Sequence, residues 1–368
     1  MMNKSNLGIY IHIPFCRSKC PYCDFYSFVG ADEEKAEYLT ALKSSISYWG
    51  KALLGRKADT LYIGGGTPSS LSGEELAEVI HAAKRAFSFT EGEITVECNP
   101  RDCSEELFGA LYTSGVNRIS LGMQSANDIE RRALGRTADS EKVISCVKLA
   151  KNVGIDNISV DIMLGVPKQT LSTLENTVKF CADMGVSHVS AYMLKLEPGT
   201  YYYKNAERLS LPDDDSVAQM YLRCVELLSQ YGYKQYEISN FAKPGFESKH
   251  NLKYWKLEDY LGIGPSAHSF IDGKRFYYPR DIKSFESALE PVFDCEGGEW
   301  QERVMLALRL SEGLDLSEFD KSRSDELLRK IKVYTDNSFA ERTAKGFRLT
   351  PKGFLVSNTI IGDLVDSQ

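Results

Sequence analysis

Residues 8–28 read GIYIHIPFCRSKCPYCDFYSF, and their three cysteines, Cys16, Cys20 and Cys23, fall within eight residues. The residues before the cysteines alternate as a β-strand does, so the stretch predicts a strand that leads into a loop of thiols. Thiolates at such short spacing are typical metal ligands, and a closed zinc site normally takes four ligands. Three thiols therefore predict a metal centre with one side open to another molecule.

Two kinds of metal centre remain open at this point. A cubane 4Fe-4S cluster held through three of its irons leaves the fourth iron free to bind a small molecule. A structural zinc ion needs a fourth protein ligand, for which His12 and Cys98 are candidates. The spacing favours the cluster.

The overall composition limits the functions that this chain can have. It has 368 residues, with 51 acidic and 44 basic side chains and a formal net charge of -7. Such a surface has no general attraction for nucleic acid or anionic lipid. The first residues lack the continuous apolar core of a signal peptide, and no window reaches the length of a membrane span. We therefore expect a cytoplasmic protein that binds no nucleic acid and has no integral membrane segment.

The other cysteines are expected to be structural. Nine cysteines are an odd number, which in a reducing compartment favours metal ligands and core residues over disulfides. The helical spacing of apolar neighbours places Cys146, Cys181 and Cys224 on buried helix faces. Cys98, Cys103 and Cys295 show no such pattern, and none of these six is favoured as a ligand.

Short β-rich runs alternate with longer helical patterns along the first part of the chain. The runs are GIYIHI, TLYIGGG, EITVECNP, RISLGMQS, ISVDIMLG and HVSAYML, and helices are predicted over 32–54, 73–87, 103–114, 140–153 and 171–184. Six such units predict an α/β fold with a parallel sheet, either doubly wound or a full or partial barrel. The active site of such a fold lies where its strands end.

The pattern changes after about residue 212. A helix is predicted over 213–231 and a strand over 234–241, KQYEISNF, followed by a loop-rich stretch. From residue 299 onward, amphipathic helices precede GFRLTPKGFLVSN, which predicts a strand, a turn and a helix. This end of the chain is therefore expected to form a small winged-helix-like unit.

Unusual polar residues follow the predicted strands. LYIGGGTPSSL puts three glycines and Thr67 at a strand end, where the absence of Cβ lets the backbone approach a ligand closely. Glu97, Gln124 and Asp161 end later strands, and a charge at the end of a buried strand needs a partner or a ligand. Arg136 suits a ligand carboxylate, although a solvated cation at a helix end is the alternative.

The arrangement CxxxCxxC directly after a first strand resembles the radical S-adenosylmethionine superfamily. This resemblance implies that Cys16, Cys20 and Cys23 hold a 4Fe-4S cluster whose open iron binds S-adenosylmethionine. It also implies that an electron from the cluster cleaves the sulfonium to a 5'-deoxyadenosyl radical, while the protein supplies position and shielding. The glycine loop would contact the amino group of S-adenosylmethionine.

Six motifs in combination resemble the oxygen-independent coproporphyrinogen III oxidase-like family over residues 8–360: YIHIPFCRSKCPYCDF, GGGTPS, GMQS, LGR, DIMLGVP and GIGPSAHS. The resemblance implies a partial (β/α)6 barrel in residues 1–235 and a C-terminal α+β region in residues 236–368. It implies these S-adenosylmethionine contacts: Tyr10, Tyr22, Gly65, Gly66, Thr67, Glu97, Gln124, Arg136 and Asp161. Lys195 and His268 stand at further, less well matched positions.

Two departures from the oxidases and one motif favour the heme-chaperone branch of this family. Phe25 stands where the oxidases carry a fourth cysteine, and only fifteen residues precede Cys16 where they carry a long arm. Residues 249–255, KHNLKYW, match the HNxxYW motif of the branch, which makes His250 a candidate heme ligand. Without the family, ordinary packing would be the simpler interpretation of these side chains.

The resemblance therefore implies two functions. The favoured one is a chaperone that binds heme and delivers it to heme-accepting proteins, respiratory ones among them. The alternative is an enzyme that oxidatively decarboxylates porphyrinogen propionates, and no catalytic residue is assigned for it. The cofactors implied are the 4Fe-4S cluster, S-adenosylmethionine and heme.

Overall fold

Six parallel strands at the centre of the sheet follow one another in chain order. The computed structural model describes residues 6–89, 91–287 and 290–366. The six strands are β1 (Leu7–Ile13), β2 (Ala58–Gly65), β3 (Glu93–Cys98), β4 (Arg118–Gln124), β5 (Asn157–Leu164) and β6 (His188–Met193). A doubly wound sheet would reverse this order at a switch point. The structure therefore has the predicted partial (β/α)6 barrel.

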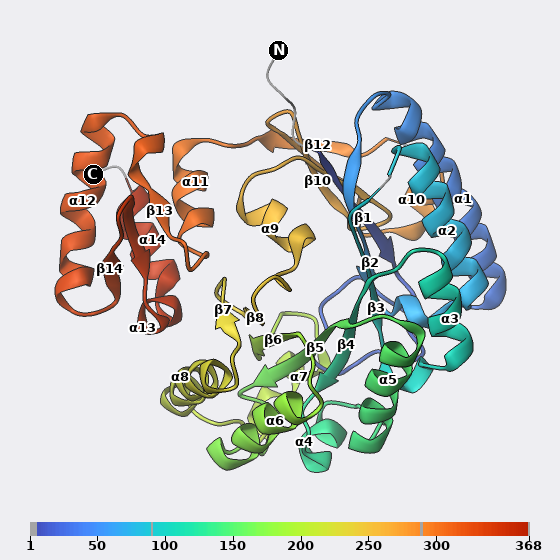
Figure 1. Cartoon of the computed structure of the whole chain (residues 1–368), viewed down its shortest axis with the longest axis horizontal. Coiled ribbons are helices and arrows are strands. Elements are labelled where there is room, and N and C mark those ends of the chain that lie inside the picture. The colour runs from blue at the N-terminus through green and yellow to red at the C-terminus, as the bar shows by residue number, and fades with distance from the viewer. Residues whose placement is uncertain (1–5, 90, 288–289, 367–368) are drawn as a thin grey trace.

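Helices connect successive strands and cover the outer, convex face of the sheet (Figure 1). They are α1 (Asp32–Ala52), α2 (Gly73–Ala86), α3 (Glu105–Thr113), the short α4 (Asp128–Ala133), α5 (Ser140–Val153) and α6 (Leu171–Asp183). Their ends follow local chemistry: α5 begins after Asp139, which accepts from the Lys142 N–H, and ends at Gly154 in the left-handed conformation. The predicted connecting helices are confirmed within a few residues.

Further strands extend both edges of the sheet. Beside β1 lie β9 (Tyr260–Ile263), which is parallel to it, and then β10 (His268–Ile271), β11 (Lys274–Tyr277) and β12 (Val292–Glu296), which are antiparallel. Beside β6 lie β8 (Asn240–Ala242) and β7 (Lys234–Gln235). Strands after residue 235 thus join the same sheet as β1, and the proposed boundary at 235/236 falls inside the β7–β8 hairpin; it stays a prediction.

The single strand predicted over 234–241 is wrong, because the chain turns back between β7 and β8. The Tyr236 N–H donates to the Asn240 carbonyl at 3.1 Å, and the Glu237 carboxylate accepts from the Ser239 N–H at 3.1 Å. The buried Glu237 side chain therefore satisfies the backbone of a turn that the apolar pattern did not signal.

Short helices occupy the remaining connections. They are α7 (Tyr201–Lys204), α9 (Lys249–Trp255), α10 (Ile282–Ser287) and the 3-10 turns η1 (Pro68–Ser70), η2 (Pro100–Asp102), η3 (Ala206–Arg208) and η4 (Leu316–Glu318). The longer α8 (Asp214–Gln230) packs against α6. Figure 1 shows α9 on the concave side, between the sheet and the C-terminal unit.

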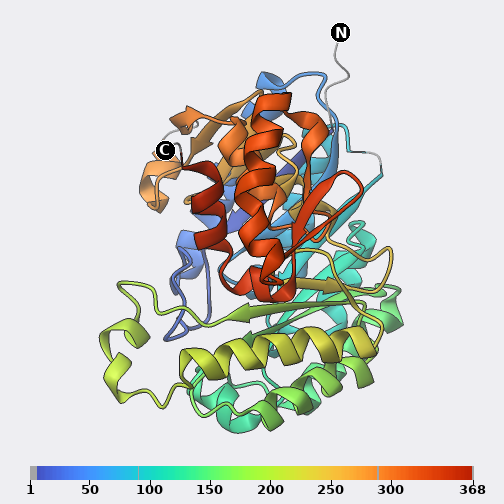
Figure 2. The ribbon, with the colours of Figure 1, turned by 90° about the vertical axis from the view of Figure 1, so that its left-hand side faces the viewer.

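The C-terminal residues form a small α+β unit that faces the viewer in Figure 2. It contains α11 (Trp300–Ala307), β13 (Leu314–Asp315), α12 (Lys321–Asp336), β14 (Ala340–Arg342), β15 (Gly346–Leu349), α13 (Pro351–Leu355) and α14 (Ser357–Val365). Its antiparallel sheet has the order β13-β15-β14, as a winged-helix-like unit requires. The Ile238 N–H donates to the Arg309 carbonyl at 2.9 Å, which ties the unit to the β7–β8 hairpin.

The two faces of the barrel sheet differ in chemistry because side chains alternate along each strand. Residues such as Ile9, Ile63 and Val96 are buried against the outer helices, where Cys146, Cys181 and Cys224 are also fully buried as predicted. The opposite positions carry polar side chains: Tyr10, Tyr62, Glu97, Ser120, Asp161 and Ser190. The inner surface of the barrel is therefore polar. Across the described ranges, every helix is too short or too polar to cross a bilayer.

Candidate functional site

The cysteine loop joins β1 to α1 and is closed at its base by backbone hydrogen bonds. The Cys16 N–H donates to the Phe28 carbonyl and the Phe28 N–H to the Pro14 carbonyl, each at 2.9 Å. Phe15 packs edge-on against Phe28 and Tyr38. Cys16, Cys20 and Cys23 lie between these anchors as partly exposed free thiols. The loop is thus held firmly at both ends while its thiols stay accessible.

The three thiols suit a cluster better than a single ion. Burial raises the pKa of the Cys23 thiol and Lys19 lowers it, while Cys20 and Cys16 are close enough to raise it further. In the part of the chain that the structure describes, no three His, Cys, Asp or Glu side chains converge on a position for one metal ion. In a cubane cluster each thiolate binds a different iron, so the thiols must be spread around the loop. The donor set therefore fits a 4Fe-4S cluster.

His12 links the barrel to the cysteine loop and is not free to bind zinc. Its Nε2 donates to the Tyr26 carbonyl at 2.8 Å, which leaves Nδ1 to accept from the Tyr10 hydroxyl at 3.0 Å. Burial lowers the pKa of His12 to about 4, so the imidazole is neutral at pH 7. Both ring nitrogens are used within the protein, which removes His12 as the fourth ligand of a zinc site.

The glycine loop after β2 packs directly on the cysteine loop. The Gly66 N–H donates to the Ile13 carbonyl and the Thr67 N–H to the Phe15 carbonyl, both at 2.7 Å, and the Thr67 hydroxyl lies 3.3 Å from Cys16 Sγ. Gly65 has φ +111°, and a Cβ there would lie 2.6 Å from the His12 ring. A glycine is thus needed at position 65 because His12 of the same protein lies so close. Ligand contact by Gly65 and Gly66 stays a prediction.

Glu97 and Asp161 face each other inside the barrel. The Glu97 carboxylate accepts from the Tyr62 hydroxyl at 2.8 Å and from the Gly65 N–H at 3.2 Å. Burial, together with the smaller effect of the nearby Asp161, raises its pKa to about 7. Burial also raises the pKa of Asp161, which accepts from the Ser120 hydroxyl at 3.2 Å. Two carboxylates held apart from water in this way favour a cationic ligand.

Arg136 and Gln124 complete this group. A Cβ on Gly122 would lie 3.2 Å from Gln124 Nε2 and 3.6 Å from an Arg136 terminal nitrogen, so the two side chains meet above Gly122. Gln124 follows a β-bulge and has φ +73°, a strained conformation of the kind found at binding sites. The structure therefore brings Glu97, Asp161, Gln124 and Arg136 together. The prediction that Asp161 ends its strand is wrong, because β5 continues to Leu164 and Asp161 faces the barrel from within the strand.

The Arg136 guanidinium contains an unpaired buried atom. One terminal nitrogen donates to the Tyr22 hydroxyl at 2.8 Å, but Nε is inaccessible to solvent and has no partner. Leaving a buried N–H unpaired costs about 1–3 kcal/mol, which a ligand carboxylate would offset. Arg136 is therefore not the solvated helix-end cation of the alternative interpretation. The residues present fit S-adenosylmethionine, which carries both a carboxylate and cationic groups.

Lys195 follows the end of β6 and His268 begins β10, so the two residues lie on opposite wings of the sheet, and both side chains are exposed. Lys195 pairs with Glu197 at 2.8 Å, and the His268 ring stacks on Tyr277 with 5.7 Å between centroids. Both therefore stand on the same side of the barrel as the cysteine loop without a direct bond to the carboxylates. Their contact with S-adenosylmethionine stays a prediction.

His250 lies at the opposite end of the barrel and is completely buried. Its Nδ1 lies 2.8 Å from the Thr60 hydroxyl and its Nε2 lies 2.7 Å from the Tyr254 hydroxyl, while its ring stacks on Tyr62. Burial lowers the pKa of His250 to about 3. In this conformation the HNxxYW motif is a packing unit, and His250 would have to give up a hydrogen bond to bind heme iron. Its role as an axial ligand stays a prediction.

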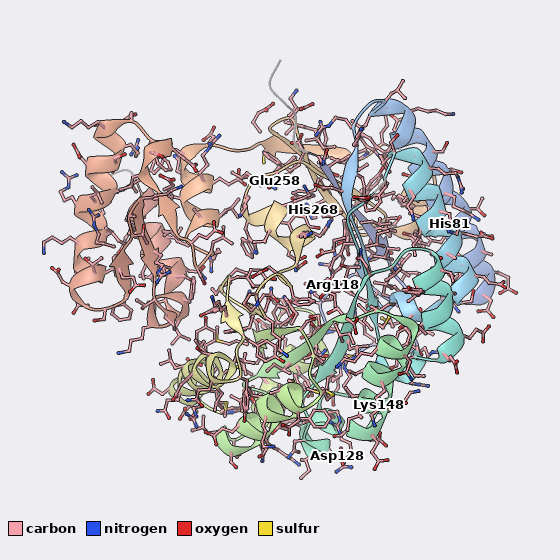
Figure 3. The ribbon with its side chains drawn as sticks, in the orientation of Figure 1. His81, Arg118, Asp128, Lys148, Glu258 and His268 are labelled. Atoms are coloured by element: carbon pink, nitrogen blue, oxygen red, sulfur yellow. The ribbon has the colours of Figure 1, made fainter. Side chains whose placement is uncertain are left out.

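Two buried charges near the site were missed by the sequence reasoning. Arg118, at the centre of the molecule in Figure 3, has a buried Nε without a partner and lowers the pKa of both Glu97 and Asp161. Its position two residues before Ser120 on one strand face was an available signal. Asp102 pairs with Arg17 of the cysteine loop and accepts from the Ser69 hydroxyl at 3.3 Å. Nothing in the local sequence indicated that Asp102 would contact the cysteine loop.

Comparison with known proteins agrees with this geometry. A family model for the radical SAM superfamily matches residues 10–181, and one for the HemN C-terminal domain matches residues 299–356. The heme chaperone HemW of Bacillus subtilis (strain 168) is 35% identical over 96% of this chain and 97% of its own length. That of Escherichia coli (strain K12) is 36% identical over 74% of this chain and 73% of its own length.

Among solved structures, coproporphyrinogen III oxidase (HemN) from Escherichia coli superimposes with a TM-score of 0.84. The match covers 98% of this chain and 90% of that one at 22% identity, so it shows the fold alone. Fold and thiol loop define a radical S-adenosylmethionine protein, a class whose members carry a 4Fe-4S cluster and S-adenosylmethionine. Within that class, the chain belongs to the family of heme chaperone HemW proteins.

Proposed function

We propose that this protein binds heme, a 4Fe-4S cluster and S-adenosylmethionine, and that it delivers the heme to acceptor proteins, respiratory ones among them. The observation that carries the proposal is the 35% identity to a heme chaperone over nearly the full length of both chains. We place the protein in the cytoplasm, because all nine of its cysteines are free, as a reducing compartment keeps them.

Each group at the barrel mouth has a distinct task in this proposal. Cys16, Cys20 and Cys23 hold the cluster, which supplies an electron for cleavage of the sulfonium when that chemistry is used. The unpaired Nε of Arg136 donates to the carboxylate of S-adenosylmethionine, and Glu97 accepts from its amino group. Asp161, Gln124, Tyr10, Tyr22, Gly65, Gly66 and Thr67 line the remaining surface, with Lys195 and His268 at its rim.

A second function, oxidative decarboxylation of porphyrinogen propionates, is favoured by one observation. The polar groups for S-adenosylmethionine are all present, and a protein that only stores heme has no evident need of them. Against it stands Phe25, whose side chain is 69% exposed where the oxidases are expected to carry a cysteine. The fourth thiol that the oxidases are expected to carry is therefore missing from this loop.

One experiment separates the two functions. Anaerobically prepared protein is given heme, passed through gel filtration and then mixed with apomyoglobin, whose holo spectrum reports transfer. We expect about one heme per chain to be retained and then to pass to the acceptor. In parallel, the same preparation is incubated with coproporphyrinogen III and S-adenosylmethionine. Protein that retains no heme but forms the divinyl product would replace the chaperone proposal by the oxidase.

A further inference from the structure

The two most exposed aromatic side chains in the described ranges border a single cleft. Phe25 is 69% exposed and Tyr201 is 64% exposed, and both line a cavity of about 570 Å³ beside the cysteine loop. Exposed aromatic rings leave a large apolar area in water, which is unfavourable unless a partner covers it. The volume lies in the range of sites for small organic ligands. The cleft therefore has both the size and the unpaired apolar surface of a binding site.

The walls of the cleft are fixed to one another, so its shape does not depend on a mobile loop. The Tyr202 N–H donates to the Pro21 carbonyl at 2.9 Å, which joins α7 to the cysteine loop. The Ile282 N–H donates to the Tyr26 hydroxyl at 2.9 Å, which joins the start of α10 to the same loop. Tyr202 is itself buried, with its hydroxyl on the Ala133 carbonyl at 2.5 Å. A ligand would thus meet a preformed site.

Two cations reach the rim of this cleft in a molecule whose net charge is -7. The Lys19 ammonium donates to the Phe25 carbonyl at 2.5 Å and to the Ser27 hydroxyl at 2.8 Å, which leaves one of its three N–H groups free. The Arg280 guanidinium contacts Asp24 through its carbonyl and its carboxylate, which leaves further N–H groups free. The rim carries more positive than negative charge and has free donors for carboxylates.

We infer that this cleft is the heme site: the porphyrin lies against Phe25 and Tyr201, and its propionates bind Lys19 and Arg280. The inference rests on the proposed function and names the place where that function occurs. A porphyrin is a planar aromatic dianion, which matches two exposed rings and two cations. Cys20 and Cys23 line the same cleft, so the heme lies next to the cluster and distant from His250. Phe25, in place of a cysteine, supplies the apolar surface that the porphyrin covers.

The test compares heme affinities of cluster-loaded, full-length variants by the Soret band. The double variant Phe25→Ala/Tyr201→Ala should bind heme at least about tenfold more weakly, and so should Lys19→Gln/Arg280→Gln. Phe293→Ala, an exposed ring on the edge strand β12, and Lys332→Gln, an exposed lysine on α12, lie outside the lining of the cleft; they are matched controls and should bind as the wild type does. Iron and sulfide contents are measured in every variant and should stay unchanged.

Two further probes distinguish the parts of the inference. Heme dimethyl ester, which lacks the carboxylates, should bind the wild type as weakly as heme binds Lys19→Gln/Arg280→Gln; equal affinity for heme and its ester would overturn the role of the two cations. Binding of heme to the wild type should also perturb the absorption of the neighbouring cluster.

The possible failures have different meanings. If the wild type retains heme and both double variants retain it equally well, the cleft is not the site, although the chaperone function stands. If His250→Ala alone abolishes binding while the protein keeps its stability, the site is at α9 and the inference is overturned. If the wild type binds no heme, the proposed function itself fails and the cleft has no porphyrin to hold.

Discussion

Glu97 lies in the barrel with a pKa of about 7, raised mainly by burial. The unfolded chain releases this proton near pH 4.5, so between these values the folded state holds a proton that the unfolded state has lost. Stability therefore falls as the pH rises through this window, and the cost is fully present above pH 7. At neutral pH the carboxyl group is therefore partly protonated and partly ionised, and a bound cation would stabilise the ionised form.

We expect Glu97→Gln to become more stable relative to the wild type as the pH rises. Without cofactors, its advantage in free energy of unfolding should grow by about 2 kcal/mol between pH 5.5 and pH 8. Urea unfolding at both pH values measures the change, and Glu74→Gln, an exposed carboxylate on α2, is the control. A constant difference at both pH values would mean that Glu97 is ionised throughout.

Single residues also show how far sequence reasoning could reach at the site. Glu97 and Gln124 were predicted because each lies at the end of a β-rich run, and the carboxyl ends of parallel strands meet. Asp161 was predicted for the same reason, although it lies within β5 and meets the others because alternate side chains of that strand face the barrel. The roles of His12 and Asp102 could not be predicted, because their partners Tyr26 and Arg17 lie in a loop whose path is not set by any periodicity. Such links depend on tertiary packing.

At the scale of elements, α9 is docked by its own polar groups. The Glu93 carboxylate on β3 accepts the N–H groups of Lys249 and His250, each at 3.1 Å, and so caps the start of the helix. His250 then bridges Thr60 on β2 to Tyr254 one turn along. This arrangement makes His250 a structural residue that positions α9 in the folded protein.

We expect His250→Ala to lower the free energy of unfolding by about 3 kcal/mol, because two buried hydroxyls lose their partner and a cavity remains. Chemical denaturation measures this loss. His81→Ala is the matched control: His81 is exposed on the outer helix α2, as Figure 3 shows, and its removal should change little. If His250→Ala keeps normal stability but shows an altered heme spectrum, His250 is again a candidate heme ligand.

The elements differ in how well their sequence predicts them. The helix α5 was predicted to the residue because its apolar residues form a clear helical stripe, and in the structure Asp139 and Gly154 cap it at the same bounds. The β7–β8 hairpin was predicted as one strand because KQYEISNF has β-forming residues and contains neither Gly nor Pro to mark a turn. Its turn depends on the buried carboxylate of Glu237. Strands β9–β12 lack strong periodicity and were not assigned, since pairing with β1 defines them.

At the scale of the whole molecule, the nine cysteines divide by environment. Five are buried, three lie partly exposed on the cysteine loop, and Cys295 is exposed on the edge strand β12. Thiol reactivity follows accessibility and ionisation, so a cluster on the loop should hide three thiols that its removal exposes. The count of reactive thiols therefore reports the cluster without any assay of activity.

We expect a maleimide to label one thiol per chain in anaerobic, cluster-loaded protein and four after the iron is removed by a chelator. Mass spectrometry of intact protein gives the number, and Cys295→Ser should reduce each count by one. Labelling of Cys16, Cys20 or Cys23 in protein that still contains its full iron would contradict their assignment as ligands.

The parallel pairing of β1 with β9 also governs the order in which the molecule can be completed. Gly8 pairs with Tyr260 and Ile11 with Ile263, so one edge of the strand that carries the cysteine loop stays open until the chain has been synthesised past residue 263. At typical translation rates this delay is on the order of 10–50 s. During synthesis the thiols of the cysteine loop thus lie beside an unpaired strand edge. The nascent chain is therefore most exposed to oxidation and misassembly at this loop, which is also the reactive part of the finished protein.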